Sequence, residues 1–478
     1  MMGAPPGMMP RGPRSGGRMR MFAAFSERDF AWFFAGNSAF FLAMQMNFIL
    51  RGYLAFDLTG KAVSLAAIAV AIALPMLVVA PIGGVVADRV DKRRLLIVTQ
   101  SLAAASDLVV AVLVIFGWIE YWHLVAGALG TGAVFAVNMP ARQAMVPQLV
   151  PQHRLMNAIS LQMGGMNLTR IFGPAAAGLL IAPLGVGGVY LVTTALFALA
   201  VASEFQLPRH GMVAATGPIT DLRAEVLGGF SYISRQPLMR LLIVTGLLMP
   251  LFSFPVQQLL PVIAEEVFAG DPFDSATALG ILAGSTGVGG LVGALIAANL
   301  DSAPRKGLIM LTGGIIMGCF LIAFSATGPF FVALIFLALA NTGSMLFMTT
   351  NNTVIQASVD QEVRGRVMAV LLMSFGVMPL GVIPVTVAAD AFGALAAIAG
   401  TSVVMLAALL VFFGVSSTLR RLEIAALGEA ALSPAQAARL VAEGRISSEE
   451  AERLTRGVGG AVPARALSGG SRSGALGG

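Results

Sequence analysis

Charged residues are scarce in this chain of 478 residues. Asp, Glu, Lys and Arg together make up 11% of it, whereas hydrophobic residues make up 57% and the mean hydropathy is +0.85. A soluble globular chain carries about a quarter charged residues, so this composition excludes a soluble protein. The sequence therefore predicts a membrane protein that crosses the bilayer several times.

The chain also has little cysteine and histidine. Cys319 is its only cysteine, so no disulfide can form within the chain, and the three histidines are scattered. No Walker phosphate-binding loop, zinc-protease helix motif or nucleophile elbow is present. The basic residues line membrane edges rather than one aromatic-bearing domain, which argues against a nucleic-acid partner. We therefore expect no enzyme, no cofactor and no bound metal.

Long apolar runs fill most of the sequence. A bilayer core about 30 Å thick needs roughly 20 apolar residues per helix. The runs are continuously apolar rather than alternating, which excludes a transmembrane β-barrel and leaves helices as the spanning elements. We predict an all-α membrane protein with twelve transmembrane helices, at 30–56, 63–87, 94–117, 122–146, 155–183, 185–206, 239–266, 275–299, 307–326, 329–357, 366–389 and 393–416.

A polar, charged stretch divides these runs into two halves of six. A shift of 209 residues places Gly84 on Gly293 and Val150 on Val359, which suggests a faint internal repeat, although shared drift of apolar sequence could produce the same offset. Parallel six-helix halves are typical of transporters whose site lies between them. The predicted domains are a basic tail (1–29), a first half (30–206), a linker (207–238), a second half (239–416), a short helical tail (417–456) and a disordered end (457–478).

The placement of Lys and Arg predicts the orientation. With residues at the span ends counted with the adjoining loops, 28 of the 30 fall on the side of both tails and the even-numbered connections. Only Arg51 and Lys61 remain for the other side. The positive-inside rule then puts both termini in the cytoplasm of a multi-pass protein of the cell (inner) membrane. We expect a monomer surrounded by lipid.

Polar side chains are concentrated in every third span. Desolvating such a side chain costs a few kcal/mol unless it finds a partner or a wet cavity, so these positions indicate an inner surface. At about 100° per residue, one face of the first span and one face of the tenth collect such positions: Asn37, Met44, Asn47 and Arg51, and Asn341, Ser344, Met345, Met348 and Asn352. Hydrogen bonds between neighbouring helices are the alternative explanation. The predicted substrate cavity contains Asn37, Met44, Asn47, Arg51, Asn138, Gln257, Gln258, Asn341, Ser344, Met348 and Asn352.

A charged loop follows the second apolar run. Six charged residues lie between Gly84 and Arg94, and the segment resembles the loop between the second and third spans of the major facilitator superfamily, with the pattern G-x-L-a-D-R-x-G-r-k. The matching residues are Gly84, Asp88, Arg89, Lys92 and Arg93, while Asp91 stands where that family prefers glycine. The resemblance implies a latch in which Asp88 meets the positive end of the eleventh helix and breaks away when the cytoplasmic side opens. A loop that only sets topology is the alternative.

Further motifs narrow the resemblance. The run from Asn167 to Gly178 resembles the G-P-x-x-G-G motif of superfamily antiporters, with Ala177 in place of the first paired glycine. Its motif residues are Asn167, Arg170, Gly173, Pro174 and Gly178; a plain packing kink at Pro174 is the alternative. Pro140 to Pro151 and the gating-type residues Arg364 and Arg366 complete the pattern. Over about residues 24–418 the chain resembles the drug/proton antiporter and enterobactin-exporter branch.

That resemblance implies secondary active export of small amphiphilic molecules, such as drugs or siderophore-like compounds, in exchange for protons. A uniporter or lysophospholipid flippase of the same fold, and a receptor-like protein that transports nothing, are the alternatives. Asp107 is the one carboxylate well inside a predicted span, which makes it a candidate for proton coupling or for a hydrogen-bonded structural role. Arg51 could bind an anionic substrate, pair with Asp57 or Asp390, or reach the headgroups.

Overall fold

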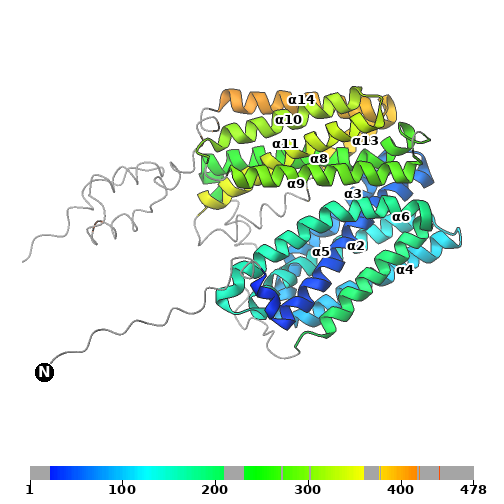
Figure 1. Ribbon diagram of the computed structural model, residues 1–478, viewed down its shortest axis with the longest axis vertical. Helices are drawn as coiled ribbons and strands as arrows, with labels where there is room; N and C mark the ends of the chain where they lie inside the picture. The colour runs from blue at the N-terminus through cyan, green and yellow to red at the C-terminus, as the bar shows by residue number, and fades with distance from the viewer. Residues whose placement is uncertain are drawn as a thin grey trace, which may run out of the picture. The chain divides into compact units, whose positions relative to one another are not determined.

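The computed structural model describes residues 22–208, 231–270, 273–300, 303–359, 376, 378–416, 419, 422 and 441, with the backbone alone for 80–89. The predicted basic tail up to residue 21, most of the predicted linker (209–230) and nearly all of the predicted tail and end after residue 416 lie outside the described residues. Helices form the described part of the chain (Figure 1), together with one isolated β-bridge between Ala269 and Phe273.

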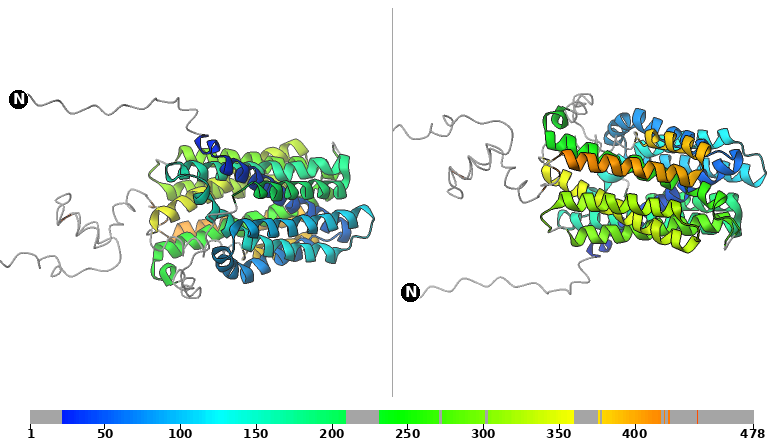
Figure 2. Two further views of the ribbon diagram at one scale, coloured as in Figure 1. Left: turned by 90° about the horizontal axis from the view of Figure 1, so that it is seen from below. Right: turned by 90° about the horizontal axis from the view of Figure 1, so that it is seen from above.

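Packing divides the chain into two compact units. Unit 1 comprises Met1–Thr59 and Val70–Pro218, and unit 2 comprises Gly60–Ala69 and Ile219–Gly478. Helix α3 (Val63–Arg89) begins in unit 2 and continues in unit 1. Within each unit the helices run lengthwise alongside one another in every view (Figures 1 and 2).

Unit 1 is built around a long broken helix. Its main helices are α2 (Arg28–Thr59), α4 (Lys92–Ile115), α5 (Tyr121–Leu149) and α6 (Leu155–Phe205), with short 3-10 helices at Ala23–Ser26 and Gln152–Arg154. Helix α2 packs along α6, and α4 packs on both α5 and α6. Helix α6 consists of two helices joined at Gly185, whose φ of 67° only glycine adopts readily. The break falls where the sequence predicts the end of the fifth span.

Unit 2 contains six further helices. They are α8 (Pro237–Glu266), α9 (Ser275–Asn299), α10 (Lys306–Ala326), α11 (Phe330–Ser358), α13 (Pro379–Phe392) and α14 (Ala394–Val415). Helix α10 packs against both α11 and α14, and α9 packs on α11. Small residues permit the close approach of α9 to α11, because a Cβ added at Gly289 would collide with the Ala338 backbone.

Acidic caps fix the start of three helices. Asp91 Oδ1 accepts from the Arg94 amide at 2.8 Å at the start of α4, and Asp274 Oδ2 accepts from the Thr277 amide at 3.1 Å at the start of α9. Asp390 of α13 caps a helix remote in sequence: its two oxygens accept from the amides of Ala62 (2.6 Å) and Val63 (3.0 Å), at the start of α3. Free backbone N–H groups at a helix start account for all three contacts.

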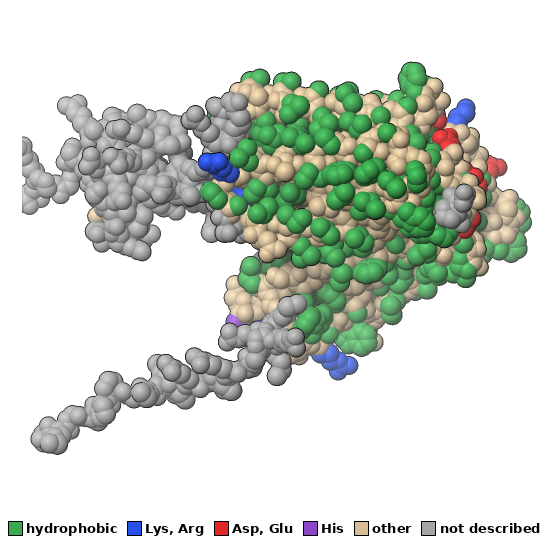
Figure 3. Space-filling view, turned by 45° about the horizontal axis from the view of Figure 1, so that its top comes forward, with side chains coloured by type: hydrophobic (Ala, Val, Ile, Leu, Met, Phe, Trp, Pro, Cys, Tyr) green, Lys and Arg blue, Asp and Glu red, His purple; other side chains and the backbone are tan. Residues whose placement is uncertain are grey.

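The exposed surface of the helices is that of a membrane protein. Hydrophobic side chains cover the flanks, and acidic side chains gather at one end (Figure 3). Nine of the described helices are long and apolar enough to cross a bilayer, and α6 is counted among them as one. Counting its two parts separately and adding the shorter apolar helices Val63–Val79 and Pro379–Phe392 fits the predicted pattern of twelve. The predicted start of the eleventh range, at 366, lies outside the described residues, and the described helix there is Pro379–Phe392.

Candidate functional site

A buried polar cluster in unit 1 surrounds Asp107 of α4. Its Oδ2 accepts hydrogen bonds from Asn47 Nδ2 of α2 (2.6 Å) and from Thr193 Oγ1 of α6 (2.7 Å). Its Oδ1 lies 3.8 Å from Arg51 Nη2, also of α2. Asp107 is 1% exposed and Arg51 5%. The carboxylate therefore joins three helices in a site where both members of the ion pair are removed from water.

Thr193 gives this cluster a choice of hydrogen-bond patterns. Its hydroxyl carries one proton but has two acceptors in reach, Asp107 Oδ2 and the Tyr190 carbonyl oxygen at 2.9 Å. When Asp107 is ionised, Thr193 can donate to it. When Asp107 is protonated, the carboxyl can donate to the Thr193 oxygen while Thr193 donates to the Tyr190 carbonyl. Both protonation states of Asp107 thus find partners without a change of fold.

A second buried cluster surrounds Arg142 of α5, which is 1% exposed. Its guanidinium donates to Asn37 Oδ1 of α2 (2.8 Å) and to Asn138 Oδ1, and its Cζ lies 4.1 Å from the centroid of the Phe40 ring. Asn138 Nδ2 in turn donates to Thr99 Oγ1 of α4 at 2.7 Å. Asn37 and Asn138, both predicted to face a substrate cavity, are buried and bonded to this arginine.

The charged loop leads into a third contact region. Arg93 is buried and donates to the backbone carbonyls of Glu204 (2.8 Å) and Phe205 (2.9 Å), the last residues of α6. A cation at the carboxyl end of a helix satisfies free carbonyls and complements the helix dipole. Asp91, which departs from the family pattern, is the N-cap of α4. The structure describes only the backbone of Gly84, Asp88 and Arg89, and Arg364 and Arg366 lie outside the described residues.

Three functional candidates were absent from the sequence prediction. Thr193 gave no signal, because a lone threonine in an apolar span is common. Arg142 lies in the segment from Pro140 to Pro151, four residues from the predicted end of its span, and so counts with the adjoining loop. Glu204 is fully buried, with Gln100 Nε2 3.4 Å from its Oε1, yet it lies two residues from the predicted end of its span and so resembled an edge residue. A charged residue within a few positions of a predicted span end can thus be fully buried, as Arg142 and Glu204 are.

The antiporter-type motif lies on α6 as predicted. Gly173 lies against α2, where an added Cβ would stand 2.5 Å from the Gln45 Cβ, and Gly178 is buried. Pro174 is inside the helix. Asn167 and Arg170 are exposed, and Arg170 lies inside α6 rather than in the loop with which the charge count placed it. The motif therefore combines a packing face with an exposed polar face.

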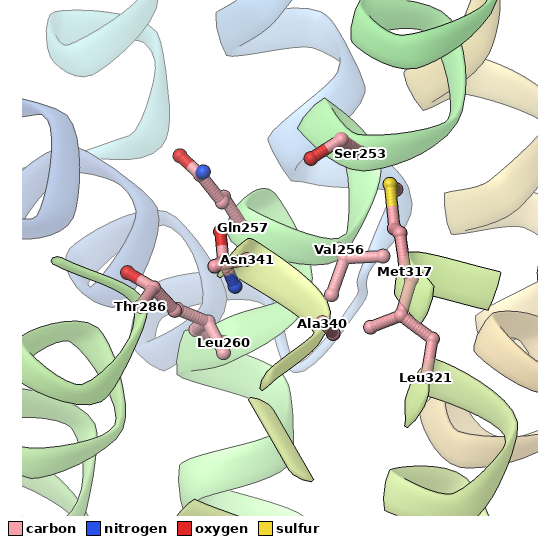
Figure 4. A pocket seen from close by; sticks show the side chains of 9 residues that line it. All are labelled: Ser253, Val256, Gln257, Leu260, Thr286, Met317, Leu321, Ala340 and Asn341. Atoms are coloured by element: carbon pink, nitrogen blue, oxygen red, sulfur yellow. The ribbon is translucent and has the colours of Figure 1, made fainter. Parts of the chain in front are cut away.

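Unit 2 contains a small polar pocket (Figure 4). It lies between α8, α9, α10 and α11, and its lining residues are Ser253, Val256, Gln257, Leu260, Thr286, Met317, Leu321, Ala340 and Asn341. The half-buried Gln257 amide has no hydrogen-bond partner among the described residues, whereas Asn341 Nδ2 donates to the Leu337 carbonyl at 3.0 Å. Every side chain of this lining is uncharged.

The other predicted cavity residues differ in exposure. Met44 of α2 and Ser344, Met348 and Asn352 of α11 are half-buried, while Gln258 and Asn47 are buried. Ser344 Oγ lies 3.3 Å from Ser253 Oγ, which links α11 to α8 beside the pocket. No group of three or more metal-ligating acidic, His or Cys side chains occurs in the described part of the chain.

Comparison with known proteins identifies the family. The model of the family described as transmembrane secretion effector, a group of major facilitator superfamily transporters, matches residues 19–445. The staphyloferrin A transporter of Staphylococcus aureus is 26% identical over 76% of this chain and 90% of its own length. The multidrug efflux pump Tap of Mycolicibacterium fortuitum is 28% identical over 74% and 87%. The enterobactin exporter EntS of Salmonella typhi is 25% identical over 60% and 67%.

Solved structures support the same fold. The nucleoside transporter NupG superposes with a TM-score of 0.62 at 15% identity, covering 81% of this chain and all of the other. A bacterial homologue of the lysosomal transporter Spinster gives 0.62 at 13% identity, covering 85% and 98%. The predictions of an all-α facilitator fold and of a transporter rather than an enzyme are confirmed. This chain belongs to the transmembrane secretion effector family of the major facilitator superfamily and is a multi-pass membrane protein that moves small molecules across the bilayer.

Proposed function

We propose that this transporter exports small amphiphilic molecules, such as drugs or siderophore-like compounds, by alternating access coupled to the entry of protons. The observation that carries the proposal is the Asp107 cluster, a buried carboxylate with partners for both of its protonation states. Intramembrane ionisable groups are costly and usually functional. Relatives named as a multidrug efflux pump, a macrolide efflux protein and an enterobactin exporter support export as the direction.

Protonation of Asp107 would change what holds α2 to α4. The ionised carboxylate attracts Arg51 and accepts from Asn47, so both α2 residues favour the helix position seen here. A neutral carboxyl keeps its bond to Thr193 but loses most of its attraction for Arg51. Asp107 therefore binds a proton more readily when α2 has moved away than in the position seen here. Such a difference in proton affinity between two conformations is the requirement for coupling.

Substrate contact is proposed for four helices, α2, α5, α8 and α11. Their half-buried members, such as Gln257 and Asn341, are the positions open to a molecule, while the buried Asn37, Asn47, Arg51, Gln258 and Asn138 would act on it only after a rearrangement. The complete proposed set is Asn37, Met44, Asn47, Arg51, Asn138, Gln257, Gln258, Asn341, Ser344, Met348 and Asn352.

Gating and orientation are part of the same proposal. The cytoplasmic gate would consist of Gly84, Asp88, Arg89, Lys92, Arg93, Arg364 and Arg366. Arg93 would hold α4 to the end of α6 while the gate moves. The antiporter-type motif on α6 would let α6 slide against α2 at Gly173. The protein would lie in the inner membrane as a monomer with both termini in the cytoplasm.

Transport by purified protein in liposomes tests the coupling. Ethidium flux is measured with and without an imposed pH gradient, for the wild type, for Asp107→Asn and for the matched control Glu265→Gln, which alters an exposed carboxylate. Asp107→Asn should abolish gradient-driven flux but retain exchange of ethidium across the membrane without a gradient. Unchanged gradient-driven flux in this variant would remove Asp107 from the mechanism.

The alternatives give different results in the same assay. A uniporter or lysophospholipid flippase of this fold would move its substrate regardless of the pH gradient in the wild type as well. A receptor-like protein would move nothing under either condition. Flux that requires the gradient in the wild type and in Glu265→Gln is therefore the result that the antiport proposal needs.

A further inference from the structure

The first part of α6 has three distinct faces. Gly165, Thr169 and Gly173 are buried, and an added Cβ at Gly165 or Gly173 would collide with α2. A second face is apolar and exposed: Leu168, Phe172 and Leu179 are 51%, 60% and 47% exposed. A third face is also exposed but carries polar and flexible side chains, Met163, Asn167 and Arg170, at the i, i+4, i+7 spacing of one helix side.

The two exposed faces cannot have the same surroundings. At about 100° per residue, Arg170 and Phe172 point in nearly opposite directions. Arg170 lies fifteen residues after Leu155 and fifteen before Gly185, so it is about 22 Å along the axis from either end of its helix. An arginine at this depth is costly in hydrocarbon. The apolar stripe therefore faces lipid, and the Arg170 face borders water.

Arg170 also differs from three other arginines of unit 1. Arg51 pairs with Asp107, Arg142 donates to Asn37 and Asn138, and Arg154 pairs with Glu27. No described residue lies within ion-pair or hydrogen-bond distance of Arg170. Its exposed guanidinium is therefore available to an anion, with the exposed Asn167 amide one turn away as a second donor.

We infer that Arg170, with Asn167, binds an anionic group of the transported molecule, most simply a carboxylate. A guanidinium and a carboxylate match in charge and in planar geometry. The inference rests on the proposed export function and deepens it, because it assigns the substrate class: amphiphiles that carry a carboxylate. It also assigns the anion-binding role to α6 of unit 1 rather than to the uncharged pocket of unit 2.

Cysteine labelling tests the local charge without a known substrate. In a Cys319→Ala background, Asn167→Cys is labelled with an anionic sulfonatoethyl and a cationic trimethylammonioethyl methanethiosulfonate, each rate being divided by its rate with a free thiol. The anionic reagent should be favoured about tenfold with Arg170 present. Arg170→Gln should remove this preference and Arg170→Lys should keep it. The control Phe172→Cys, on the lipid face, should react slowly with both reagents.

A second experiment measures transport of an anionic and a cationic dye. Flux of 6-carboxyfluorescein and of the cationic dye ethidium is compared in liposomes for the wild type, Arg170→Gln and Arg170→Lys. Arg170→Gln should reduce carboxyfluorescein flux about tenfold and leave ethidium flux within twofold, and Arg170→Lys should retain most of both.

The outcomes separate this inference from the proposed function. Equal loss of both dyes, no preference in the labelling, or a wild type that moves ethidium alone would overturn the carboxylate assignment and leave export standing. A wild type that moves neither dye counts against the proposed export function, whatever the labelling shows.

Discussion

The two units place their charges differently. Unit 1 buries Arg51, Asp107 and Arg142 between its helices, each about two turns inside the nearer helix end. In the described helices of unit 2, ionisable side chains such as Lys306 and Asp390 occur near the ends, and the interior polar groups are neutral amides and hydroxyls. Because a buried charge costs several kcal/mol unless it is paired, unit 1 must bind its helices together through specific partners. Unit 2 can rely on close packing of small residues.

This difference suggests a division of labour. The interactions of the Asp107 cluster change when its carboxylate takes up a proton. Neutral amides do not titrate near neutral pH, so their own hydrogen-bonding capacity does not change with pH. Coupling is therefore expected in unit 1, and pH-independent substrate contacts in unit 2. Substitutions in the two units should lower the free energy of unfolding by different amounts, and this difference can be tested.

The largest effect should come from Arg51→Leu. This change leaves the Asp107 carboxylate buried without a countercharge, and the free energy of unfolding should fall by about 3–5 kcal/mol. The measurement is reversible unfolding by SDS in mixed micelles, followed by circular dichroism. The double variant Arg51→Leu with Asp107→Asn should recover most of the loss, because no unpaired charge remains. If the double variant is as unstable as the sum of the two single variants, the ion pair does not stabilise unit 1.

Asp390→Ala in unit 2 should have a smaller effect. Its carboxylate caps α3 through the amides of Ala62 and Val63, and loss of such a cap costs about 1–2 kcal/mol. The nearby Glu266 carboxylate repels Asp390, which places the expected loss at the lower end. Hydrogen exchange of residues 60–69 should accelerate in this variant. The control Asp274→Ala removes a local cap of α9 and should leave that exchange unchanged; acceleration in both would mean that unit 2 loosens as a whole.

The sequence predicted the fold well because hydrophobic runs and loop charges act locally. The ranges of α8, α9 and α10 match the predicted spans within two residues, and the break at Gly185 falls where the predicted fifth and sixth spans meet. Partners across helices were harder to predict. The sequence left an anionic substrate, Asp57, Asp390 and the headgroups open as partners of Arg51, and the structure pairs it with Asp107, 56 positions away on another helix. Sequence spacing cannot reveal such a contact, since helix register and tilt decide which side chains meet.

The smallest effect on stability should come from Gln257→Leu in the unit 2 pocket. The half-buried amide has no partner among the described residues, so its replacement by an apolar side chain of similar size leaves no unsatisfied group behind. We expect the free energy of unfolding to change by less than about 0.5 kcal/mol, while ethidium flux falls several-fold because a hydrogen-bonding position toward substrate is lost. The control Ser325→Ala, outside the pocket on α10, should change neither quantity. A loss of unfolding free energy comparable to that of Arg51→Leu would mean that neutral polar groups stabilise unit 2 as strongly as the ion pair stabilises unit 1. The two units would then differ in the type of their polar contacts and not in the stability that those contacts provide.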